Sequence, residues 1–80
     1  MKIIFKDYTF HSDKFLETSS SVSANSRSVG YTILSLHESE AYANLEILSF
    51  LEARYKDKKT SDELIESVLE LISNGTISKN

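Results

Sequence analysis

Apolar and polar residues alternate at the start of the chain, with the two-residue period of a β-strand. Apolar side chains keep one parity up to Phe5 and the opposite parity from Tyr8 onward, so the phase changes at Lys6-Asp7. A bulge or a tight turn would each produce this change. We expect one bulged strand over about 2–11, because Lys6-Asp7 lacks the residues that readily adopt positive φ in a two-residue hairpin loop.

Two further strands are expected, over about 15–24 and 29–36. The stretch 18–28 is more than half serine and threonine, so it forms either a weak strand or a mobile loop. In the segment 29–36, bulky apolar side chains occupy both parities, which indicates a strand with both faces covered.

The second half of the chain is rich in Leu, Glu, Ala and Lys and changes to helical periodicity. A first helix is predicted over about 40–57, with Ser39 as its N-cap. A second helix is predicted over about 61–74, where Thr60 and Glu63 have the spacing of a capping box. The apolar residues of this second helix fall within an arc of about 160°, which predicts a surface helix with one buried stripe. They are Leu64, Ile65, Val68, Leu69, Leu71 and Ile72.

The segment Asn74-Gly75-Thr76 follows this second helix. Gly75 readily adopts the left-handed conformation that closes a helix, so we interpret Asn74-Gly75 as a helix stop. The same three residues match the N-glycosylation sequon, which has meaning only in a secreted eukaryotic protein.

Strands followed by helices are typical of the α+β class. We therefore expect a single domain over residues 1–80, with a small antiparallel sheet of two or three strands followed by two α-helices packed on one face. Apolar residues make up 40% of the chain and charged residues 26%, which is ordinary for a globular protein.

The composition excludes several kinds of site and location. The chain has no cysteine, which excludes disulfides, thiolate metal ligands and a cysteine nucleophile. No apolar stretch approaches the roughly 18 residues needed to span a bilayer, and the apolar run at Ile3–Phe5 is too short for a secretory signal. We expect a cytoplasmic protein that does not bind membranes.

Catalytic and cofactor chemistry finds little support in the residues. His11 and His37 each have carboxylates nearby, but neither lies in a known metal-binding spacing. The chain lacks a Gly-x-Ser-x-Gly motif and a glycine-rich phosphate loop. We expect no enzyme activity and no cofactor, and a metal-dependent or serine enzyme is the third choice.

The first predicted helix is apolar around most of its circumference. Its main stripe includes Leu45, Leu48 and Leu51, which should face the core. A second strip on another side is available to a partner. The leading prediction is therefore a small non-enzymatic protein-binding module that binds another protein, or itself as a homodimer. The residues of this strip are Ala43, Ile47, Phe50 and Arg54.

Charge supplies the alternative prediction. Nine Lys and Arg residues against twelve Asp and Glu residues give a net charge of −3, which argues against direct binding of nucleic acid. An acidic helical face could instead imitate nucleic acid and dock on a basic target protein. The alternative is thus a stoichiometric inhibitor of the virus-encoded type, with Glu63, Glu66 and Glu70 as its binding face.

Overall fold

The computed structural model describes residues 1–36 and 42–80. The predicted N-cap Ser39 and the histidine His37 lie outside the described residues. Within them the α+β class is confirmed, but the structure has four α-helices and two short 3₁₀ helices where two helices were predicted. In chain order the elements are β1 (Lys2–Ile4), β2 (Tyr8–His11), α1 (Ser12–Thr18), η1 (Ser19–Ser21), α2 (Ala24–Leu34), α3 (Ile47–Tyr55), η2 (Lys56–Lys58), α4 (Ser61–Ser73) and β3 (Ile77–Lys79).

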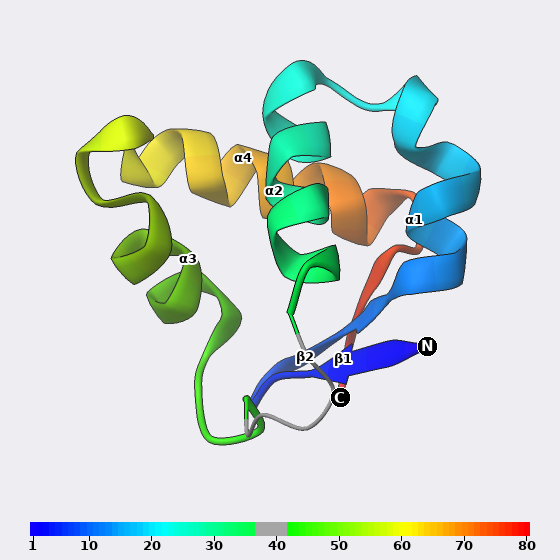
Figure 1. Ribbon diagram of the computed structural model, residues 1–80, viewed down its shortest axis with the longest axis horizontal. Coiled ribbons are helices and arrows are strands. Elements are labelled where there is room, and N and C mark those ends of the chain that lie inside the picture. The colour runs from blue at the N-terminus through cyan, green and yellow to red at the C-terminus, as the bar shows by residue number, and fades with distance from the viewer. Residues whose placement is uncertain (37–41) are drawn as a thin grey trace.

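The sheet has the order β1-β2-β3, and both pairs of strands are antiparallel. Phe10 of the central strand pairs with Ile3 on one side and with Ile77 on the other. All three side chains are buried, so this row forms the core face of the sheet. In Figure 1 the sheet lies in the lower part of the view, and α2 crosses α4 above it.

The prediction of one bulged strand over 2–11 is wrong, because the chain turns back between β1 and β2. The backbone N–H of Phe5 donates to the carbonyl of Tyr8 at 2.8 Å, and none of the turn residues has positive φ. Contacts distant in sequence hold the turn. The N–H of Lys6 donates to the carbonyl of Leu45, and the Asp7 carboxylate accepts from the N–H of Ile47 at 3.0 Å.

The predicted strands over 15–24 and 29–36 are also wrong, since this region forms α1, η1 and α2. The buried positions of α2 are Ser26, Val29, Gly30 and Ile33, which is helical spacing once small residues are counted as inward-facing. Ser23 caps the helix by accepting from the N–H of Ser26 at 3.2 Å. Packing of this face overrides the strand preference of the β-branched residues.

The first predicted helix begins later than expected, at Ile47 rather than near residue 40. Leu45, which was expected to face the core, lies before α3 and is exposed, whereas Leu51 is buried and Leu48 is half-buried. The helix ends at Tyr55, and the next residue, Lys56, has a φ of +47°, a conformation that side-chain-bearing residues seldom adopt.

The second predicted helix agrees closely with α4. The capping box is complete, because Thr60 accepts from the N–H of Glu63 and the Glu63 side chain accepts from the N–H of Thr60. Gly75 follows the helix end with φ +86°. The Asn74 side chain donates to Thr18 and accepts from the N–H of Thr76, so it is held in the fold as the helix-stop interpretation requires.

Candidate protein-binding face on helix α4

Helix α4 buries only half of its apolar arc. Its inward residues are Leu64, Ser67, Val68 and Leu71, which pack toward α2 and α3. Ile65 and Leu69 belong to the same arc but remain exposed, with 41% and 59% of their surfaces accessible. Because these two residues are four apart, their side chains lie one above the other on the helix surface.

Two carboxylates run beside this apolar pair. Asp62 and Glu66 are also four residues apart, and both are exposed. In the part of the chain that the structure describes, neither side chain has a hydrogen bond or an ion pair. Helix α4 has no basic residue at all. We call Asp62, Ile65, Glu66 and Leu69 the α4 face: an apolar row with an anionic row next to it.

Glu70 lies on the other flank of the inward stripe from Ile65 and Leu69, and it has a structural role. Its carboxylate accepts from the N–H of Ser23 at 3.2 Å, from the Ser23 hydroxyl at 2.9 Å and from the Ser26 hydroxyl at 2.5 Å. Ser26 is fully buried. Glu70 therefore fastens the first turn of α2 to α4.

Glu63 is likewise engaged in structure. Besides closing the capping box with Thr60, its carboxylate accepts from the Asn25 side chain of α2 at 3.4 Å. The sequence-based grouping of Glu63, Glu66 and Glu70 as one acidic face does not match this arrangement, since only Glu66 is free of structural hydrogen bonds among the described residues. Asp62, which that grouping omitted, joins Glu66 on the α4 face.

These hydrogen bonds stabilise the charged forms of both glutamates. The hydroxyl of Ser26, and then the hydroxyl and N–H of Ser23, lower the pKa of Glu70 below its usual value. The backbone N–H and then the hydroxyl of Thr60 lower the pKa of Glu63. A carboxylate whose pKa is depressed by folding stabilises the folded state above its unfolded-state pKa, and that stability is lost as the pH falls.

We therefore expect acid to weaken the protein through Glu70. The urea midpoint should be constant near neutral pH and should fall as the pH drops from about 5 toward 3, where the carboxylates become protonated. Glu70→Gln should lower the midpoint at pH 7 and flatten the pH profile. Glu66→Gln makes the same change of charge at a carboxylate that has no hydrogen bond among the described residues, so it is the matched control and should keep the wild-type midpoint at pH 7. A Glu70→Gln protein with the wild-type profile would show that the Ser23–Ser26–Glu70 contact adds nothing to stability.

The strip predicted on the first helix is divided by the fold. Ile47 is completely buried. Phe50 is half-buried and packs its ring against Phe5 and Tyr42 at centroid distances of 5.4 and 5.9 Å. Ala43 lies before α3, and Arg54 is exposed near its end. The four residues therefore do not form one exposed row.

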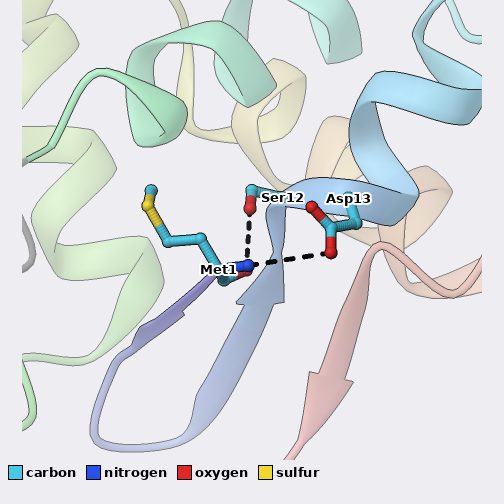
Figure 2. Close-up of polar contacts among 3 residues, drawn as sticks. All are labelled: Met1, Ser12 and Asp13. Atoms are coloured by element: carbon cyan, nitrogen blue, oxygen red, sulfur yellow. Dashed lines mark hydrogen bonds and ion pairs between the residues drawn. The ribbon is translucent and has the colours of Figure 1, made fainter.

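The segment around the first residue contains a polar depression. In Figure 2 the Met1 carbonyl faces Ser12, whose hydroxyl donates to it at 2.7 Å, and the Met1 amine lies 3.7 Å from the Asp13 carboxylate. An open hollow of about 410 Å³ lies here, with Lys2, Lys14 and Glu17 at its edges. Cations and carboxylates are mixed around it, so no charge class of ligand is favoured.

The described part of the chain also has no cluster of side chains suited to binding a metal ion. Residues 1–36 and 42–80 contain no group of three His, Asp or Glu side chains that could hold a metal ion. The His11 ring instead hydrogen-bonds the Ser78 hydroxyl at 2.7 Å across β2 and β3. His37, the other histidine considered, lies outside the described residues.

The α4 face could have been found in the sequence by one signal. An apolar arc of about 160° is wider than the stripe of about 100° that a helix needs to cover a core, and the excess predicts exposed apolar side chains.

No helix within the described ranges is long and apolar enough to cross a membrane. Comparison with protein-family models, with curated proteins and with solved structures finds no match to this chain.

Proposed function

We propose that the protein is a non-enzymatic protein-binding module that contacts its partner through the α4 face. The observation that carries the proposal is the exposure of Ile65 and Leu69 side by side on a helix whose other half is firmly packed. Exposed apolar side chains in a row, bordered by charged residues, are typical of protein contact sites.

The support for this face is rigid, which suits binding. The capping box fixes the beginning of α4, and the Ser23–Ser26–Glu70 contact fixes its last turns against α2. A contact surface that is ordered before binding loses little conformational entropy in the complex. The α4 face thereby replaces the first-helix strip as the proposed contact surface, because that strip has Ile47 in the core.

The second candidate is the stoichiometric inhibitor that docks on a basic target. One observation favours it: α4 carries Asp62, Glu63, Glu66 and Glu70 and no basic residue. Because Glu63 and Glu70 have structural roles, Asp62 and Glu66 are the carboxylates of α4 that lack a hydrogen bond or ion pair among the described residues, which is a small surface for imitating nucleic acid. The protein-binding module that uses the apolar pair Ile65 and Leu69 is therefore the first candidate.

The test compares the double variant Ile65→Gln/Leu69→Gln with Leu16→Gln. Leu16 is a matched control, because it is an exposed leucine on another helix with 57% of its surface accessible. A protein captured from the native host on the wild-type chain is identified, purified and titrated calorimetrically against each variant. We expect the double variant to lose about tenfold or more in affinity, since each apolar anchor contributes roughly 1 kcal/mol.

Leu16→Gln should bind like the wild type, and both variants should keep the wild-type circular dichroism spectrum. A purified partner that binds the double variant with undiminished affinity would place the contact surface elsewhere and overturn the proposal. The appearance of catalytic turnover on addition of that partner would contradict the non-enzymatic part.

A further inference from the structure

We infer that the segment received by the α4 face is a basic amphipathic helix of a different protein, with an apolar row and a row of Lys or Arg side by side. This inference rests on the proposed function and names the chemistry of its partner. It follows from the order of side chains across the helix: Ile65 and Leu69 in one row, and Asp62 and Glu66 in the row next to it.

The charge of the face selects the sign of the partner. Asp62 and Glu66 have no hydrogen bond or ion pair within the described ranges, so a partner that covers them must supply the compensating charge. A partner that left them covered and unpaired would lose the solvation of two carboxylates. Lys or Arg beside the partner's apolar row would meet them as flanking charges do in coiled coils.

A second copy of this chain is a poor occupant for the same reason. In a two-fold dimer the same patch meets itself, so Asp62 and Glu66 of both copies would enter one interface without any basic residue of α4 to balance them. The two exposed apolar side chains also supply far less than the roughly 800 Å² per partner of a standard stable interface. The face is suited to a short, complementary segment.

The backbone of the partner segment is expected to be helical. An extended segment laid across Ile65 and Leu69 would bring its backbone N–H and C=O groups against apolar side chains that cannot hydrogen-bond them. A helix satisfies these groups internally and presents side chains four apart that can alternate with those of α4. The spacing from Asp62 to Leu69 corresponds to about two helical turns.

The experiment uses two synthetic helix-forming peptides of about 18 residues, which share a row of leucines and differ only in having Lys or Glu beside it. Each is titrated into the isotope-labelled full chain, and the amide shifts and the dissociation constant are measured. We expect the Lys peptide to perturb residues 62–69 and to bind more weakly as salt rises from about 50 to about 500 mM, because salt screens exposed charges. The Glu peptide should not bind.

Charge reversal on the chain provides the decisive comparison. Asp62→Lys/Glu66→Lys should weaken binding of the Lys peptide by about tenfold or more and should create binding of the Glu peptide. Single variants give the matched control: Glu66→Lys should weaken the Lys peptide, whereas Glu17→Lys, an exposed helical glutamate on α1 with the same change of charge, should not.

The other outcomes separate this inference from the proposed function. Equal binding of both peptides at residues 62–69 would overturn the basic partner while leaving the face as a contact site. Concentration-dependent self-association that perturbs the same residues would make a second copy of the chain the occupant. That result would likewise overturn the basic partner while leaving the face as a contact site. Shifts centred on another surface, or no binding of the Lys peptide, would overturn the inference, and the purified-partner titration then decides the proposed function separately.

Discussion

Replacing Ile47 by Asp is expected to unfold the protein. The Ile47 side chain is fully buried at the start of α3, so the variant loses an apolar core contact and gains a carboxylate with no partner. The backbone N–H of Ile47 already donates to the Asp7 carboxylate, which adds a nearby like charge. The combined cost exceeds about 4 kcal/mol, comparable with the roughly 4–12 kcal/mol that holds a domain of this size.

Ala43→Asp is the matched control, because it introduces the same side chain into the same predicted strip at an exposed position. It should change the free energy of unfolding by about 0.5 kcal/mol or less. Circular dichroism and urea unfolding of both variants measure the difference. A folded Ile47→Asp protein that has lost an oligomeric state of the wild type would show that the first-helix strip is a contact surface after all.

Gly30→Ala is expected to destabilise the protein, although alanine is the better helix former by about 1 kcal/mol. A Cβ on Gly30 would lie 2.0 Å from Cε1 of the Phe15 ring. The ring cannot easily move aside, because Phe15 is fully buried and its ring contacts those of Phe10, in a tilted arrangement, and Tyr31, edge to face, at centroid distances of 5.6 and 5.0 Å. We expect a net loss of about 2 kcal/mol, which lowers the melting temperature of a domain this small by roughly 10 °C.

A double-mutant cycle with Phe15→Leu tests the cause. Each single variant should be less stable than the wild type, and the double variant should be more stable than the sum of the two losses predicts, because the smaller side chain relieves the overlap. Thermal and urea unfolding supply the four free energies. A Gly30→Ala protein stabilised by the helix-propensity gain alone would show that the ring does not rest on Gly30.

Local signals in the sequence were sufficient to predict helix α4 and both of its ends. The Thr60–Glu63 box, the apolar period and Gly75 each act over a few residues, so they determine the same structure whatever surrounds them. The absence of cysteine excluded thiol chemistry in the same local way. Apolar alternation predicted extended backbone at Ile3 and at Phe10 but joined them in one bulged strand, because the turn between them depends on the distant Leu45 and Ile47 backbone.

Helix α2 shows where the sequence pattern misleads. Its inward face includes Ser26 and Gly30, which an apolar-periodicity analysis counts as outward. They face inward because Glu70 comes close enough to bond the Ser26 hydroxyl and because the Phe15 ring rests on the bare Cα of Gly30. Small residues are favoured by close approach of neighbours, and that approach is a property of the assembled fold.

The sequence by itself therefore determined the α+β class, the ends of α4 and the width of its apolar arc. The tertiary structure decided that β3 joins β2 and that α2 and α3 cover only the Leu64–Leu71 side of that arc. The residue pattern along a helix predicts how much of its surface is apolar. How much of that surface is buried depends on how many other helices and strands the chain can pack around it. In a domain with so few elements that number is small, and Ile65 and Leu69 remain exposed beside Asp62 and Glu66.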